Sequence, residues 1–329
     1  MNNSSLKEWC NTINVPLIVS TYWGNEVLAI ASGKIEKIGF DRPKGIYYKA
    51  PWLKIATWGN IWTFREYTDI AFTSQIGGSC DRVFLPRKFE ETGNIGSREI
   101  AGEFIAASKL SCLVVQDEYY SVLPVWKPKW IDRPVLEDRC HVNGIALDEK
   151  GDLAYVTALG TNNRKEGWRQ SEPVGGCIID AKNKTAIVNT LRMPHSPRLY
   201  RGLLWVCDSM RGELSVIDVE TQKRQPFVKF PEFVRGLAFW QDWAIVGLSR
   251  MRYTKRGWIA GEGRCGLAAV NLNTAKVEAV LNLNASEIFD VQVMPGENPV
   301  VVDPRSSVLN SLLVLPENNL NGDRSKTKK

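Results

Sequence analysis

The two histidines, His141 and His195, are the only imidazoles in this chain of 329 residues, and each lies in a short polar segment that leads into an apolar stretch. His141 is followed at the second position by Asn143, and His195 is followed by Ser196 and then by Arg198. Imidazole titrates near neutral pH and serves as a general acid or base. These segments could therefore bind a small molecule and move a proton on it.

Both histidine segments are copies of a repeat. The pattern is a polar pair and a small residue, then an apolar strand, a turn and a second apolar strand. The copies start near six anchor positions, which are residues 45, 99, 144, 198, 236 and 290. A unit of roughly 40 to 50 residues that holds about four short strands is typical of a β-propeller blade.

The two chain ends complete this pattern. Residues 17–40 supply about three strands before the first anchor position, and the chain after Asp290 has room for one or two more. Joining the ends would complete a sixth blade and leave no free sheet edge. We therefore predict an all-β, six-bladed β-propeller, with seven blades as the variant and a long β-sandwich pair as the runner-up. Ser4 or Ser5 could cap a short N-terminal helix that covers one face of the fold.

The innermost strands of a propeller line its central channel, so the anchor residues should face one funnel. Such a polar cluster in a concave site is the usual first hypothesis for a functional site. We expect His141 and His195 to be the acid and the base, and the arginines to bind a carboxylate or phosphate through paired N–H donors. The predicted substrate-binding residues are Arg42, Arg98, Glu99, Asn143, Ser196, Arg198, Arg235 and Asp290.

A metal site is the less favoured alternative. Two histidines with Asn143 or Asp290 could hold a divalent ion. Glu99 and Asp290 are the only carboxylates at the anchor positions, and the arginines there would repel a cation. We therefore predict no metal and no cofactor. The chain has no glycine-rich phosphate loop, nucleophile elbow or His-Glu-x-x-His segment.

Composition restricts the class of protein. The chain is 44% hydrophobic and 24% charged, with 12 Trp and 26 Gly, and its net charge is +6. The mean hydropathy of −0.21 and the lack of a long apolar run argue against a transmembrane helix. The seven cysteines are widely spaced, without a Cys-x-x-Cys pair, and the N-terminus lacks the pattern of a secretory signal. We expect buried, reduced cysteines and a cytoplasmic location.

Four segments lie outside the repeat, namely the two ends of the chain and two insertions. We predict a helical extension over residues 1–16, a single propeller over 17–316 and a disordered basic tail over 317–329. Polar insertions over 160–173 and 249–263 could cover a binding face or be plain surface loops. The second carries the basic residues Arg250, Arg252, Lys255 and Arg256 beside Tyr253 and Trp258. We interpret it as a solvated loop rather than a nucleic-acid groove.

Several segments resemble a bacterial family of conserved, propeller-like proteins without an established activity. The segments are Glu137–Gly144 (EDRCHVNG), Met193–Arg198 (MPHSPR), Val234–Phe239 and Arg264–Gly266, and the resemblance covers most of the chain. Members of that family typically carry a His-Asp pair where this chain has Arg98-Glu99. If the family's site uses three histidines, for example around a metal, this chain lacks one of them.

Two functions remain open at this stage. The first is an enzyme, a lyase, hydrolase or isomerase, that acts on a small anionic substrate in the funnel. The second is a non-catalytic module that binds a peptide, glycan or protein partner, with Trp23, Trp58 and other aromatic residues as contact surface. Those aromatic side chains could instead stack between the blades.

Overall fold

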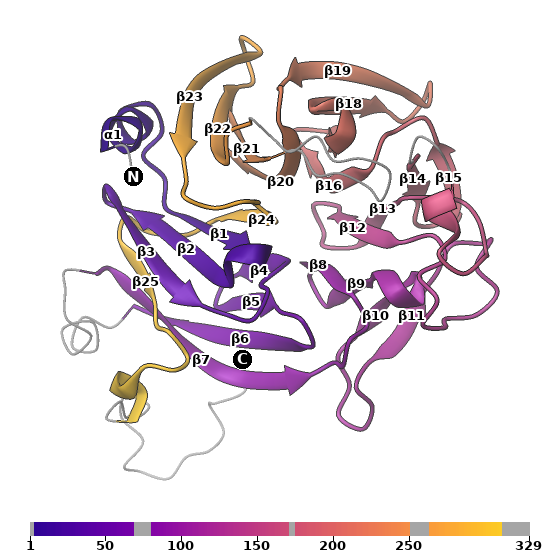
Figure 1. Cartoon of the computed structure of the whole chain (residues 1–329), viewed down its shortest axis with the longest axis horizontal. Helices are drawn as coiled ribbons and strands as arrows, with labels where there is room; N and C mark the ends of the chain where they lie inside the picture. Colours follow the sequence, from indigo (N-terminus) through magenta and orange to yellow (C-terminus); the bar gives the residue numbers. More distant parts are fainter. Residues whose placement is uncertain (1–2, 69–79, 171–174, 251–262, 311–329) are drawn as a thin grey trace.

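The chain folds as a ring of six antiparallel sheets, as seen in a computed structural model (Figure 1). The structure describes residues 3–68, 80–170, 175–250 and 263–310. Each sheet has its first strand near the centre of the ring, and the six first strands begin at or near the six anchor positions. The predicted six-bladed β-propeller is thus confirmed, and neither a seventh blade nor a pair of sandwiches is formed by the described residues.

Five blades are continuous in sequence, and their strands run outward from the axis in chain order. Blade 1 holds β4 (Ile46–Lys49), β5 (Trp52–Ala56), β6 (Asn60–Tyr67) and β7 (Arg82–Glu91); blade 2 holds β8 (Ser97–Ala101), β9 (Phe104–Ala107), β10 (Cys112–Val115) and β11 (Leu123–Trp126). Blade 3 holds β12 (Val142–Leu147), β13 (Leu153–Ala158), β14 (Cys177–Asp180) and β15 (Thr185–Val188); blade 4 holds β16 (Pro194–Tyr200), β17 (Leu203–Asp208), β18 (Glu213–Asp218) and β19 (Lys223–Lys229). Blade 5 holds β20 (Phe233–Trp240), β21 (Trp243–Ser249), β22 (Gly266–Asn271) and β23 (Lys276–Asn282).

The sixth blade joins the two ends of the chain, as predicted. Its innermost strand is β24 (Asp290–Val293), and β1 (Leu17–Thr21), β2 (Glu26–Ala31) and β3 (Lys34–Gly39) lie outside it. β24 pairs antiparallel with β1, with Asp290 opposite Ser20. The last strand, β25 (Pro299–Val301), adds in parallel to the outer edge of blade 1 beside β7. The closing pair makes the ring continuous, which removes the free edges of an open sheet.

Burial along the strands follows from their depth in the blade. The second strand, β17, is buried at every position except the first because it has strands on both sides and neighbouring blades on both faces. The outer strand β23 buries Ala279 and Leu281 and leaves the charged residues before them exposed. Strands deep in a blade are therefore almost wholly buried, whereas strands near the rim also carry exposed, charged residues.

The one α-helix of the described residues, α1 (Asn3–Thr12), lies at the outer side of the ring next to β23 (Figure 1). Its Trp9 is 1% exposed and packs with Ile13 into the apolar cluster that joins blades 5 and 6. The helix therefore seals the rim between the first and last parts of the chain. None of the helices in the described residues has the length and apolar character needed to cross a lipid bilayer.

Candidate functional site

A β-bulge near the start of four innermost strands turns side chains toward the axis. The pairing register shifts between Ser97 and Ile100 in β8, between His195 and Arg198 in β16 and between Val234 and Leu237 in β20, and β12 has a shift at Asn143. A bulge places extra residues on one strand and re-aims their side chains. The repeat thus presents Arg98, Glu99, Asn143, Ser196 and Arg235 around one centre.

Backbone conformation and glycine contacts keep these strands close. Ser196 has φ of +51° and Gly236 has φ of +81°, and the Ser196 hydroxyl accepts a hydrogen bond from the Gly236 amide at 3.1 Å. A Cβ on Gly236 would lie 3.1 Å from the backbone of Asp290. The inner strands of blades 4, 5 and 6 therefore lie in close contact at the axis.

Seven of the ten predicted site residues surround a small axial cavity. Its lining residues are Arg98, Glu99, Asn143, His195, Ser196, Arg235, Asp290 and Phe289. Its volume is about 10 Å³, which is room for about one water molecule. The expected convergence on one axis is therefore present, but this cavity is too small to hold an organic substrate.

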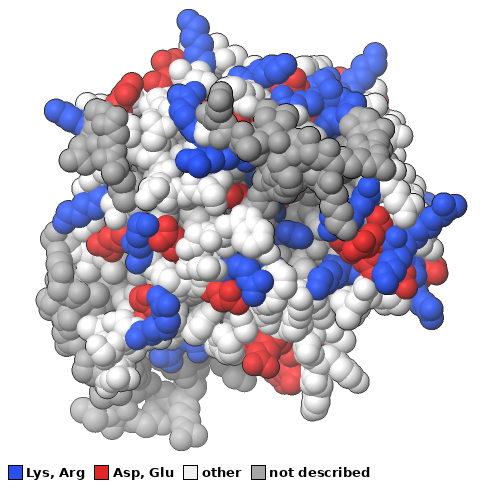
Figure 2. Space-filling view, in the orientation of Figure 1, with Lys and Arg blue, Asp and Glu red and all other residues white. Residues whose placement is uncertain are grey.

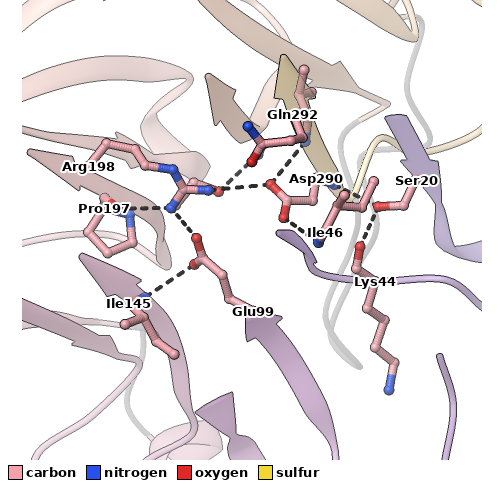
Figure 3. Close-up of polar contacts among 12 residues, drawn as sticks. Ser20, Lys44, Ile46, Glu99, Ile145, Pro197, Arg198, Asp290 and Gln292 are labelled. Atoms are coloured by element: carbon pink, nitrogen blue, oxygen red, sulfur yellow. Dashed lines mark hydrogen bonds and ion pairs between the residues drawn. The ribbon is translucent and has the colours of Figure 1, made fainter. Parts of the chain in front are cut away.

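An ion-pair cluster lies next to that cavity and shares Glu99 and Asp290 with its lining (Figure 3). The Arg198 guanidinium lies between two carboxylates: it donates to Glu99, and its Nη2 is 3.5 Å from Oδ1 of Asp290. Asp290 also accepts from the Ile46 amide at 2.9 Å, and Glu99 accepts from the Ile145 amide at 3.3 Å. Burial and the mutual repulsion of the two carboxylates raise the pKa of Glu99, and burial raises that of Asp290. Arg198 lies between the two carboxylates and offsets one of their negative charges.

A larger cavity opens on the face of the ring where the inner strands begin. Its volume is about 430 Å³. Figure 2 shows a hollow over β8, right of the centre, with a basic side chain at depth and charged side chains on its rim. The lining charged residues are Lys44, Arg98, Lys109, Lys165, Arg169, Glu137, Asp138 and Glu166. We call this space the upper cavity; it shares Arg98 with the axial cavity.

The acids of the upper cavity all have basic partners. Glu137 accepts from Arg139 at 2.8 Å. Arg169 lies 3.7 Å from Asp138 and 4.0 Å from Glu166. Arg98 donates to the Ser108 hydroxyl at 3.2 Å. The negative charges of these acids are thus already compensated by neighbouring basic side chains. The basic residues that blades 1 and 2 contribute to the cavity lining, which we call the basic wall, are not compensated in this way.

That basic wall is built around the ring of Trp58. The guanidinium of Arg42 lies 3.7 Å from the ring centroid, and the ammonium nitrogens of Lys44 and Lys109 lie 5.0 and 5.8 Å from it. Arg42 also pairs with the adjacent Asp41 and is not part of the cavity lining. Cation–π contact stabilises basic groups without neutralising them.

Lys44 is the most buried of these basic groups. Its side chain is 1% exposed, and its backbone is held by Ser20, which donates to its carbonyl, and by its amide hydrogen bond to Ala56. Figure 3 shows the side chain extended away from the Arg198 cluster, with no contact drawn to Nζ. Burial, together with Arg98, Arg235 and other basic groups, lowers the pKa of Lys44 to about 6. The amine is therefore largely uncharged at neutral pH.

His141 lies behind the cavity wall. Its Nδ1 is 2.6 Å from Oδ1 of Asp138, so the Nδ1 hydrogen points at the carboxylate and Nε2 carries a lone pair. The ring of Trp168 packs on it with centroids 4.5 Å apart, and Trp168 belongs to the 3-10 turn Gly167–Gln170 in the first predicted insertion. Burial lowers the pKa of His141 to about 4, against the raising effect of Asp138.

His195 faces the axial cavity directly. Its Nδ1 lies 2.9 Å from the Met193 carbonyl and 2.8 Å from the Ser209 hydroxyl. A carbonyl can only accept, so Nδ1 carries the hydrogen and Nε2 is unprotonated. Burial, then the charge of Arg235, holds the pKa of His195 well below its ordinary value. Both imidazoles are neutral at pH 7, and their assignment as acid and base remains a prediction.

The other predicted binding residues are engaged within the fold. Asn143 donates to the Pro194 carbonyl at 3.0 Å and accepts from Thr157 at 2.6 Å, which ties blade 3 to blade 4. Arg235 lies 3.5 Å from Glu287, with its guanidinium 3.3 Å from the ring centroid of Phe289. These contacts position the residues at the axis, and their roles in substrate binding remain predictions.

No group of three or more His, Cys, Asp or Glu side chains in the described residues is arranged to hold a metal ion. Five of the seven cysteines are buried, and all five are free thiols. Most of the remaining aromatic residues pack between strands: Trp62 contacts Phe40 and Phe89, and Trp126 donates to the Ala181 carbonyl. The basic-aromatic segment around Tyr253 and the tail beyond residue 310 lie outside the described residues.

Sequence reasoning did not select Lys44, Lys109, Asp138 or Trp168 as site residues. Asp138 carried the best available signal, because it stands three residues before His141 in the same segment. Lys44 directly precedes the first anchor position, but a lysine at a turn is ordinarily exposed to solvent. Only the neighbouring blades bury it.

The fold and the cavity define a β-propeller with a basic funnel on one face. The chain belongs to the family described as "Domain of unknown function (DUF4915)", whose model matches residues 4–302. A solved structure of a nidogen/laminin complex is similar at a TM-score of 0.54 and 8% identity, covering 85% of this chain and 98% of that one. The WD40 domain of Neurospora crassa Pan2 matches at a TM-score of 0.41 and 10% identity, covering 75% and 68%. The first likeness supports the propeller fold alone. No curated protein matches the chain.

Proposed function

We propose that the protein binds a small organic anion in the upper cavity and acts on it as a lyase, hydrolase or isomerase. The observation that carries the proposal is the basic wall: Arg98 and Lys109, beside the buried amine of Lys44, face a cavity of about 430 Å³ whose acids have Arg139 or Arg169 as partners. That volume lies in the usual range for small-molecule sites. A carboxylate or phosphate would supply the charge that the wall lacks.

The chemistry in this proposal is proton transfer, with Asp138, which lines the upper cavity, placed between the substrate and the His141 ring. His195 presents an unprotonated Nε2 at the axial cavity, next to Arg98, which lines both cavities. His141 is oriented by Asp138, whose carboxylate reaches the upper cavity. An imidazole held by a carboxylate is a common arrangement for a general base. The predicted cytoplasmic location forms part of this proposal, because a cell interior supplies such metabolites.

Anion binding gives the direct test. Calorimetric titration of the full chain with citrate, malonate and inorganic phosphate at low and high salt should give binding for at least one anion that weakens with salt. Arg98→Met and Lys109→Met should each reduce affinity about tenfold. Lys223→Met, on the exposed outer strand β19, is the matched control and should bind as the wild type does. Equal affinities for all four proteins would overturn the proposal.

A second candidate function uses the opposite end of the channel. There a cavity of about 370 Å³ is lined by Tyr47, Tyr48, Tyr200 and Phe239, and the last two rings stack with centroids 4.3 Å apart. An aromatic floor of this kind favours a non-catalytic binder of a peptide or glycan. Loss of capture of an immobilised ligand in Tyr47→Ala, with upper-cavity binding retained, would support this candidate.

A further inference from the structure

The upper cavity contains one group that proton transfer by the histidines does not use. The Lys44 side chain is 1% exposed and lines the cavity wall. No carboxylate of the described residues lies within ion-pair distance of its Nζ. The aromatic rings beside Nζ are those of Trp58 and Tyr22, whose centroids lie 5.0 and 5.8 Å from it. A buried lysine is ordinarily paired with an acid.

We propose that Lys44 is the nucleophile of the upper cavity and forms an imine with the carbonyl carbon of an oxo acid whose carboxylate is bound by Arg98 and Lys109. The inference rests on the proposed function, because the same basic wall binds the anion. It adds the substrate class and a covalent step. The three basic residues line one cavity, and Lys44 and Lys109 both lie beside the Trp58 ring.

The surroundings of Lys44 suit a nucleophilic amine. Amines react only when uncharged, and enzymes obtain an uncharged lysine by desolvation and by placing other cations nearby. Both conditions hold: burial is the main cause that lowers the pKa of Lys44, and Arg98 and Arg235 add to it. The same cations that favour the neutral amine attract the carboxylate of the substrate.

The covalent step is balanced without an outside oxidant or reductant. The Nζ lone pair attacks the carbonyl carbon, and the new C–N bond gives a carbinolamine. The carbonyl oxygen then leaves as water with the two hydrogens that were on the amine, and a C=N bond remains. Hydrolysis reverses the step and regenerates the free amine.

Reductive trapping tests the inference on the full chain. The protein is incubated with pyruvate and sodium cyanoborohydride at pH 7, and adducts are located by intact mass and peptide mapping. We expect one dominant adduct at Lys44, labelled roughly tenfold or more faster than any other lysine because surface amines are almost fully protonated at this pH. Lys44→Met should lose this adduct.

The pH profile and a neutral carbonyl provide further readouts that do not depend on a variant. Labelling of Lys44 should rise through about pH 6 and then level off, whereas surface lysines continue to gain reactivity toward about pH 10. Acetone, which has the carbonyl but no carboxylate, should label Lys44 about tenfold more slowly than pyruvate. Lys109→Met should narrow that difference, and Lys223→Met should leave it unchanged.

The outcomes separate this inference from the proposed function. If citrate binds but pyruvate leaves no adduct at Lys44, the nucleophile assignment fails and the anion site stands. If labelling is spread evenly over surface lysines, the assignment also fails. If acetone labels Lys44 as fast as pyruvate and no anion binds, the oxo-acid class and the proposed function fail together.

Discussion

The Nδ1 atom of His141 lies 2.6 Å from Oδ1 of Asp138, and the Trp168 ring packs against the imidazole with the ring centroids 4.5 Å apart. The contact fixes which nitrogen carries the hydrogen and leaves Nε2 as the basic atom. Asp138 is held in turn by its own amide, which donates to the Lys109 carbonyl at 2.8 Å in blade 2. The orientation of the imidazole is thus set by two neighbouring blades.

Replacing Asp138 by Asn should change the tautomer of His141. The amide NH₂ of Asn would donate to Nδ1, which would move the hydrogen to Nε2. Loss of the carboxylate should also lower the pKa of His141 further, because Asp138 raises it. Nitrogen chemical shifts of the two imidazoles report both effects, and the chain has only these two to assign.

The unchanged histidine provides the control for that measurement. His195 takes its tautomer from the Met193 carbonyl, so its shifts should stay the same in Asp138→Asn. An unaltered His141 spectrum in this variant would mean that Asp138 does not set the tautomer.

Removing Arg198 should be costly because it leaves Glu99 and Asp290 buried without a partner. Their side chains are only 6% and 3% exposed. Loss of one partner from a buried ion pair destabilises by about 3 kcal/mol or more, so Arg198→Met should unfold at clearly lower urea concentration. Arg201→Met, which breaks the exposed pair with Asp242, is the control and should shift the midpoint far less. Equal shifts would contradict a role for Arg198 in stabilising the two buried carboxylates.

Lys44→Met should make the protein more stable, and most strongly at low pH. The pKa of Lys44 is about 6 in the folded state and 10.5 by its ordinary value. Between these values the unfolded chain binds more protons, so wild-type stability rises with pH across this window. We expect a gain of roughly 2 to 4 kcal/mol for the variant near pH 6, shrinking toward pH 10.

Urea unfolding at several pH values measures this slope. Lys223→Met, on the exposed strand β19, should keep the wild-type slope. A Lys44→Met protein with an unchanged slope between pH 6 and pH 10 would show that the amine is charged in the folded state.

His195→Gln should reduce the loss of stability in acid. The folded pKa of His195 is well below 6.5, mainly because of burial. The unfolded chain therefore takes up a proton below pH 6.5 that the folded chain does not, and stability falls as the pH is lowered. Thermal unfolding from pH 7 to pH 5 should show a shallower decline in the variant. A parallel decline in both proteins is the outcome that contradicts this expectation.

Gly236→Ala should cost more than Gly202→Ala. Both glycines have positive φ, +81° and +73°, so both alanines carry the strain of about 1 kcal/mol for a left-handed residue. A Cβ on Gly202 meets nothing within 4 Å, whereas one on Gly236 lies 3.1 Å from the Asp290 backbone. The difference in unfolding free energy between the two variants measures how tightly the strands meet at the axis. A difference near zero would show that blade 5 can move away.

The fold could be predicted because its signal is local and repeated. Each anchor position lies within an innermost strand or directly before it, and an apolar second strand follows. The closure of the ring could also be predicted, since the strands left over at the two ends of the chain add up to one blade. The hydrogen bond from the Asp290 amide to the Ser20 hydroxyl, at 3.1 Å across 270 positions, realises that closure.

The site was predicted only in outline. That Arg98, His195 and Arg235 would approach one axis followed from their shared place in the repeat. That Arg198 would be neutralised by Glu99 and Asp290 did not follow, because the partners come from blades 2 and 6. Spacing along the chain gives the position of a residue in its blade, and it does not give the charge that faces it.

The amino-acid sequence by itself determined the number of blades and the strand that each polar segment begins, because these depend on periodicity within about 50 residues. Only the tertiary structure decided protonation and accessibility. The burial of Lys44 among Arg98, Trp58 and Lys109, and of His141 under Trp168, arises from side chains contributed by different strands and loops. Desolvation and Coulombic interaction depend on distance in space, so they appear only when the ring has closed.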